Sequence, residues 1–203
     1  MKKYPEPIQK IIQYLRKLPG VGNKTAERFA FHILDWDSLN QTEFSSALAT
    51  IKTKITTCDE CGCYKDKNDC IFCSKGHDLR TLCIIAKAKD VYTIDNMNAF
   101  SGYFHVIGSL ISPLEGKMPE DLCLDSLSDR IDKLQIEEII IALDSTLEGD
   151  TTALYLHKVL KNKKIKITKL ALGIPIGSTL EYVDEGTLSQ AFASRHTLVE
   201  KTS

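Results

Sequence analysis

The chain contains 203 residues, of which 43% are hydrophobic and 26% are charged, and its 26 basic and 27 acidic side chains give a formal net charge of −1. This ordinary hydrophobic content excludes a wholly disordered chain, and no apolar run approaches the roughly 20 residues of a membrane span. A net charge near zero argues against a protein that coats polyanions, although it conceals local patches.

The N-terminal region is basic and is predicted to be helical. Residues 1–34 carry seven basic and two acidic side chains, which is a local charge of +5. Charged residues return too soon after the first methionine for the core of a signal peptide, so we expect a cytoplasmic protein. Apolar residues at spacings of three and four predict three helices, over residues 8–18, 24–34 and 42–55.

The turn between the first two helices reads Pro-Gly-Val-Gly at residues 19–22. Its glycines permit positive φ angles and a close approach of another backbone, and the free N–H groups of the helix that follows suit a phosphate oxygen. Lys24 and Arg28 are four residues apart and project from one face of that helix. This pattern is typical of a helix-hairpin-helix element, which grips a nucleic-acid backbone without reading bases, and the alternative is an ordinary helix corner with solvated cations. The predicted DNA-binding residues are Gly20, Val21, Gly22, Lys24 and Arg28.

A polar, cysteine-rich segment follows the third predicted helix. Cys58 and Cys61 form one Cys-x-x-Cys pair, and Cys70 and Cys73 form a second pair after eight intervening residues. Two such pairs supply the four thiolates of a closed, tetrahedral, structural Zn²⁺ site. The segment is too short and polar for a core of its own, so metal binding would supply its folding energy. A redox role for the paired cysteines is the alternative, and the presence of two pairs favours zinc.

Three further cysteines bring the total to seven. Disulfides do not account for this number, because stable disulfides are uncommon in the cytoplasm and an odd number of cysteines cannot all pair. Cys63 lies inside the loop and could compete with Cys61, but two-residue spacing on both sides of the segment favours Cys61. We interpret Cys83 and Cys123 as packed thiols.

The pattern changes after residue 80. Runs rich in β-branched residues predict strands over residues 82–86, 103–107, 138–143 and 165–170. Helical patterns lie between them over residues 90–97, 122–134 and 151–160, and a last short helix is expected over 187–193. Strands that alternate with helices predict an α/β fold with a parallel sheet, and we place its boundary with the preceding helices and cysteines near residues 75–80.

Charge is uneven in this second half. Residues 115–150 hold eleven acidic and three basic side chains, a local charge of −8, whereas residues 158–169 hold six lysines and no acid. The lysines form either a solvated face or a secondary contact with a nucleic-acid strand.

Asp144, Glu148 and Asp150 follow a predicted central strand, where parallel sheets bind ligands. Their oxygens could hold Mg²⁺ or could stabilise the N-terminus of the next helix, and spacing alone does not decide.

Together, these features resemble the bacterial RecR family of recombination mediators, and the resemblance covers nearly the whole chain. The residues that carry it lie at 18–26, 58–73, 112–116 (Ser-Pro-Leu-Glu-Gly), 146–149 (Thr-Leu-Glu-Gly) and 180–188. The resemblance implies a helix-hairpin-helix head (1–56), a C4 zinc finger (57–75), a Toprim domain (81–176) and a tail (177–203) that packs on the Toprim domain or a neighbouring subunit. It also implies a ring-like homo-oligomer that works with RecO and RecF in recombinational repair.

Catalytic Toprim domains carry a glutamate after the first strand and an Asp-x-Asp pair after a later one, and these carboxylates bind Mg²⁺. Here Ala86 and Lys87 follow the first strand, and Thr146 stands where the second aspartate would be. Only Asp144 and Glu148 remain as an acidic remnant, which is too few carboxylates for a two-metal site. We therefore expect no catalytic residues, no Mg²⁺ chemistry and a docking role for this domain.

The predicted function is that of a DNA-binding mediator that helps to load recombinase onto single-stranded DNA. We expect its DNA binding to be independent of sequence, and we expect no contact with a membrane. Two other functions stay open. The first is an Mg²⁺-dependent Toprim phosphoryl-transfer enzyme, either a nuclease or a primase-like enzyme. The second is a zinc-ribbon transcription regulator, which would bind a preferred duplex sequence.

Overall fold

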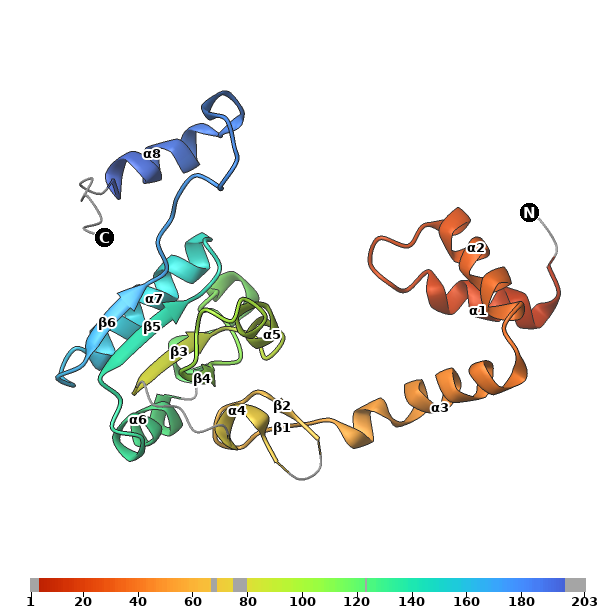
Figure 1. The fold of residues 1–203 in the computed structure, drawn as a ribbon, viewed down its shortest axis with the longest axis horizontal. Helices are drawn as coiled ribbons and strands as arrows, with labels where there is room; N and C mark the ends of the chain where they lie inside the picture. The colour runs from red at the N-terminus through yellow and green to blue at the C-terminus, as the bar shows by residue number, and fades with distance from the viewer. Residues whose placement is uncertain (1–3, 67–68, 75–79, 123, 196–203) are drawn as a thin grey trace, which may run out of the picture. The chain divides into compact units, whose positions relative to one another are not determined.

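The structure, a computed structural model, describes residues 4–66, 69–74, 80–122 and 124–195. The chain divides into two compact units, Met1–Lys54 and Ile55–Ser203 (Figure 1). The first unit is helical, and the second contains every strand of the described residues. No helix in these described ranges is both long enough and apolar enough to cross a membrane.

Three helices make up the first unit, as the apolar spacing predicts: α1 (Glu6–Leu15), α2 (Asn23–Leu34) and α3 (Ser38–Lys54). α1 packs against α2, whose Ala26 and Ala30 are buried. α3 begins four residues before the expected position. The reason is a helix cap, because the Asp37 carboxylate accepts a hydrogen bond of 2.8 Å from the backbone N–H of Asn40.

Four parallel strands form the sheet of the second unit, in the spatial order β4-β3-β5-β6. They are β3 (Thr81–Ile85), β4 (Tyr103–Val106), β5 (Glu138–Ala142) and β6 (Lys166–Lys169). All four lie where strands are predicted from the sequence. The two central strands, β3 and β5, read as nearly continuous apolar runs because helices cover both faces of a parallel sheet.

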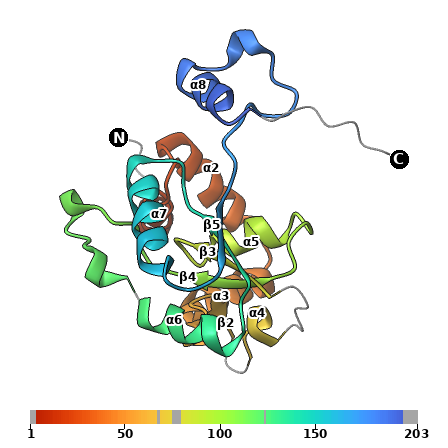
Figure 2. The same ribbon diagram turned by 90° about the vertical axis from the view of Figure 1, so that its left-hand side faces the viewer.

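Helices cover the sheet on both sides (Figure 2). α6 (Leu124–Lys133) and α7 (Leu147–Leu160) pack on one face, and α4 (Ile71–Ser74) and α5 (Asp90–Asp95) pack on the other. α7 begins four residues before the predicted position, because the Thr146 hydroxyl caps it by accepting a hydrogen bond of 3.1 Å from the Gly149 N–H. Gly149 must be a glycine, since a Cβ atom there would overlap the backbone oxygen of Asp144.

The remaining elements are short. They are β1 (Thr56–Thr57), β2 (Tyr64–Lys65), three 3-10 turns (Pro113–Glu115, Pro119–Asp121 and Leu180–Tyr182) and α8 (Glu185–Ala193). β1 and β2 form an antiparallel ribbon in the cysteine-rich segment. α8 confirms the helix expected in the tail, and the Asp184 carboxylate caps it by accepting a hydrogen bond of 2.9 Å from the Thr187 N–H.

The cysteine-rich segment falls in the second compact unit, together with the α/β fold. The boundary near residues 75–80, between the cysteine segment and the α/β domain, stays a prediction. The segment docks on the edge strand β4, where the Val106 N–H donates a hydrogen bond of 2.8 Å to the Cys61 backbone oxygen. On the same side, the Phe72 ring meets the Phe104 ring edge to face, with centroids 5.7 Å apart. Burial of this aromatic pair against the sheet holds the segment to the α/β unit.

Candidate nucleic-acid interface and metal centre

The predicted DNA-binding turn lies between α1 and α2. Gly20 has a φ angle of +78°, which favours glycine, and the turn is closed by a hydrogen bond of 3.2 Å from the Val21 N–H to the Leu18 oxygen. Gly22 is the N-cap of α2 and has no side chain to accept a hydrogen bond from the first turn of the helix. The N–H groups at the start of α2 are therefore directed to solvent, where they can bind an anion.

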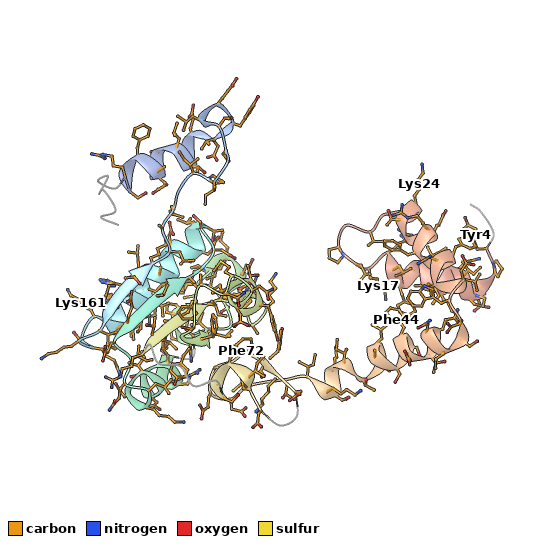
Figure 3. All side chains as sticks on the ribbon, in the orientation of Figure 1. Tyr4, Lys17, Lys24, Phe44, Phe72 and Lys161 are labelled. Atoms are coloured by element: carbon orange, nitrogen blue, oxygen red, sulfur yellow. The ribbon has the colours of Figure 1, made fainter. Side chains whose placement is uncertain are left out.

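Lys24 and Arg28 are exposed beside this turn, and Figure 3 shows Lys24 pointing away from the helical unit. The Arg28 guanidinium lies 5.6 Å from the centre of the Phe29 ring. Neither cation forms an ion pair within the described part of the helical unit, whereas Lys10 is paired with Glu6 at 2.7 Å. The structure thus places two uncompensated positive charges next to the free N–H groups, which is the arrangement that a phosphodiester requires.

The four paired cysteines converge in the second unit. The Sγ atoms of Cys58, Cys61, Cys70 and Cys73 all lie within 4.8 Å of one another. The Cys58–Cys73 and Cys61–Cys70 pairs of sulfur atoms are 3.9 and 3.5 Å apart. A regular tetrahedron with Zn–S bonds of about 2.3 Å has sulfur atoms about 3.8 Å apart, so the chemistry and the spacing of the donors fit a Zn²⁺ ion.

A tight loop holds the first cysteine pair. The Gly62 N–H donates a hydrogen bond of 2.8 Å to the Cys58 oxygen, and the Cys58 N–H donates one of 2.8 Å to the Cys63 oxygen. Gly62 has a φ angle of +74°, and a Cβ atom there would lie 2.8 Å from the Cβ of Val106, so both backbone and space require glycine. Gly62 is therefore the residue that lets the loop lie against β4.

Cys63 is fully buried and stays outside the group of four sulfur atoms. Its N–H donates a hydrogen bond of 3.4 Å to the Cys61 sulfur. Hydrogen bonding with the Cys63 thiol is the largest cause that lowers the pKa of Cys61 from its usual range.

The sequence interpretation missed two basic residues, which the structure places beside the cysteine segment. Arg130, on α6, donates one hydrogen bond of 3.1 Å to the Glu60 backbone oxygen and another of 3.4 Å to the Cys73 sulfur. Lys133, one turn later, lies 2.8 Å from the Glu60 carboxylate and is the main reason for the lowered pKa of Glu60. Arg130 follows Leu127 at helical spacing, so a cation on the apolar face of the helix was the available signal.

Cys83 does not belong to the group of four sulfur atoms. Cys83 is a buried free thiol on β3, as predicted, and burial raises its pKa to about 12. Cys123 lies outside the described residues.

Asp144 and Glu148, the predicted acidic remnant, belong to no group of three or more potential metal ligands among the described residues. Asp144 is exposed after β5, and Glu148 is half-buried in the first turn of α7. Asp150, in the same turn, is paired with Lys169 at 2.5 Å. In the described ranges, the cysteines are the only group that brings three or more histidine, cysteine or carboxylate ligands together. The geometry supports the helix-stabilising role of Glu148 and Asp150, because both lie where the helix dipole favours negative charge.

The lysine-rich stretch at residues 158–169 is partly neutralised by acidic residues of the same unit. Besides the pair at Lys169, Lys163 lies 2.6 Å from Asp132 and Lys166 lies 3.1 Å from Glu138. Each pair has one partner that is at least half exposed, so each contributes little stability. Contact of this stretch with a nucleic-acid strand stays a prediction.

Comparison with known proteins gives the same result along nearly the entire chain. Residues 8–52 match the helix-hairpin-helix of the RecR family, residues 80–171 match the Toprim domain, and residues 173–196 match the RecR C-terminal region. The recombination protein RecR of Protochlamydia amoebophila is 47% identical over 95% of this chain and 98% of its own length. The RecR proteins of Chlamydia pneumoniae and Natranaerobius thermophilus are 44% and 42% identical, over 97% and 98% of this chain and 99% and 100% of their own lengths.

Proposed function

Because the chain belongs to the RecR family of recombination proteins, we propose that it acts as a recombination mediator in DNA repair. In this role it binds DNA without sequence preference and helps to load a recombinase onto single-stranded DNA. The observation that carries the proposal is the exposed turn at residues 20–22, followed by Lys24 and Arg28, in a chain that matches a RecR protein over 95% of its length.

The DNA-binding site is the helical head. The N–H groups at the start of α2 donate hydrogen bonds to a phosphate oxygen, and Lys24 and Arg28 supply the neighbouring positive charge. Each such contact is weak, and several heads on one DNA molecule add their binding energies by multivalency. A chain with a net charge of −1 binds DNA in this way because its head is locally basic.

The metal centre has a structural role. Zn²⁺, held by Cys58, Cys61, Cys70 and Cys73, cross-links the two ends of a segment that has only the short β1–β2 ribbon and α4 as regular structure. With all four positions taken by protein sulfur, the site leaves none for a substrate. The four cysteines thereby keep the segment folded against β4.

A homo-oligomer fits the apolar surface of the head. α3 has no buried residue, and Phe44, Leu48 and Ile51, at helical spacing, are 41%, 59% and 50% exposed. An apolar stripe of this kind is expected to be covered by another protein surface. We assign the contact with this stripe to a second copy of this chain, in the ring-like assembly that the family resemblance implies. The tail that contains α8 packs on the Toprim domain or on a neighbouring subunit.

The Toprim domain acts as a docking platform and not as an enzyme. Ala86 and Lys87 occupy the positions after β3 where catalytic relatives of the fold place a glutamate, and neither can bind Mg²⁺ or transfer a proton as a carboxylate does. By family resemblance, the partners that dock are RecO and RecF, and the complex works in the cytoplasm.

We expect the protein, with RecO, to accelerate the formation of recombinase filaments on single-stranded DNA coated by single-strand-binding protein. Asp144→Asn should do so at the wild-type rate, because the carboxylate lies outside any metal-binding group of the described residues. Incubation with Mg²⁺ should leave DNA uncut and nucleotides unincorporated. Cleavage or synthesis that requires Mg²⁺ and is lost in Asp144→Asn would instead establish the phosphoryl-transfer enzyme.

A further inference from the structure

Arg130 is a buried cation that has no carboxylate partner among the described residues. It lies on α6 between the core residues Leu127 and Ile131, and only 5% of its surface is exposed. No carboxylate of the described residues lies within ion-pair distance of its guanidinium, and the nearby Glu60 carboxylate is paired with Lys133 instead. Its Nε atom is also buried without a hydrogen-bond partner in the described part of the chain.

A buried charge is strongly unfavourable unless an opposite charge offsets it. The Cys73 sulfur accepts a hydrogen bond of 3.4 Å from Nη2 of Arg130. Four thiolates and one Zn²⁺ ion leave two negative charges, which are delocalised over the sulfur atoms. The metal centre therefore supplies the counter-charge that Arg130 lacks, and Arg130 reduces the repulsion within the centre.

The second hydrogen bond of Arg130 fixes the other end of the same segment. Nη1 donates to the Glu60 backbone oxygen at 3.1 Å, and Glu60 precedes Cys61 directly. The planar guanidinium thus spans both cysteine pairs from one rigid helix, a geometry that a lysine ammonium does not reproduce.

We propose that Arg130 is the positioning residue of the zinc centre: it orients Cys73 and the chain before Cys61, offsets the charge of the thiolates, and couples metal binding to α6. This inference rests on the proposal that the four cysteines hold Zn²⁺. Hydrogen bonds from the surroundings orient metal ligands and tune their basicity, and their loss typically weakens metal binding by about 10–100-fold.

The test compares three variants of the full chain by competition with a Zn²⁺ chelator and by the sulfur-to-metal charge-transfer spectrum of the Co²⁺-substituted protein. Arg130→Met should bind Zn²⁺ about 10–100-fold more weakly and shift the Co²⁺ spectrum. Arg130→Lys keeps the positive charge but cannot make both hydrogen bonds of the planar guanidinium. Its affinity for Zn²⁺ should therefore lie between those of Arg130→Met and the wild type. Lys133→Met is the matched control on the same helix, and it should keep the wild-type affinity and spectrum, because Lys133 contacts a carboxylate and not a sulfur.

Wild-type affinity together with an unshifted Co²⁺ spectrum in Arg130→Met would overturn the inference. If Arg130→Met does not fold, Arg130→Lys provides the test instead. A wild-type affinity and a wild-type spectrum in Arg130→Lys would then overturn the inference. Failure of the wild-type chain itself to bind Zn²⁺ would contradict the proposed metal centre, and that result is distinct from a wild type that binds zinc and variants that bind it equally well.

Discussion

Replacing Lys24 and Arg28 together by alanine is expected to weaken DNA binding by a similar factor on every sequence. Both cations are exposed next to the free N–H groups of α2, where we expect them to contact phosphates rather than base edges. Each lost phosphate contact lowers the number of counterions that are released on binding. The slope of log affinity against log salt concentration should therefore become shallower by about 2 for each head that is bound. Fluorescence anisotropy with labelled DNA over a range of salt concentrations measures both quantities.

A second double variant provides the control for this experiment. Lys10→Ala with Lys52→Ala removes the same charge from the same helical unit, but Lys10 is already paired with Glu6, and Lys52 lies in the last turn of α3. We expect a small effect on affinity and slope. If the control loses as much binding as the Lys24 and Arg28 variant, or if that variant binds normally, the turn before α2 is not the DNA site.

Cys58→Ser is expected to remove the metal and to destabilise the α/β unit. Wild-type protein should contain about one Zn²⁺ ion per chain, as a closed tetrahedral site does, and the variant should contain almost none. Apparent binding energies of structural zinc are on the order of 10–16 kcal/mol in zinc-finger peptides and act as folding energy. The loss should fall on residues 55–203, because the cysteine segment packs against β4 and α6. Elemental analysis and thermal unfolding provide the measurements.

Cys63→Ala is the matched control, since Cys63 is a buried thiol in the same loop that stays outside the four sulfur atoms. It should retain its metal while losing some stability from the small cavity. Metal retained by Cys58→Ser and lost by Cys63→Ala would show that Cys63, and not Cys58, is the ligand.

Much of the fold and of the site follows from local patterns in the sequence. The spacing of Cys58, Cys61, Cys70 and Cys73 identifies the group of sulfur atoms, because four thiols in two short loops have few ways to meet. The four parallel strands follow from β-branched runs that alternate with helical patterns. The exposed Pro-Gly-Val-Gly turn follows from glycines that allow the positive φ angle observed at Gly20.

The features that the sequence interpretation missed depend on contacts between distant residues. The cysteine segment joins the α/β unit through Phe72 and Phe104, which are 32 positions apart in the sequence. Periodicity reports which face of a helix is apolar but not what lies against it. For the same reason, Arg130 could be recognised as a cation on the apolar face of α6, but its partner, the Cys73 sulfur, became evident only from the packing.

The central claim is that this chain binds the DNA backbone without reading its sequence. Equilibrium binding of the wild-type protein to two DNA molecules of unrelated sequence, measured from low to physiological salt, tests this claim most directly. We predict equal affinities for the two sequences at each salt concentration, and a steep loss of affinity as salt rises, because counterion release drives the binding. Absence of binding, or a preference of about 10³-fold or more for one sequence, as sequence-reading regulators show, would contradict the claim.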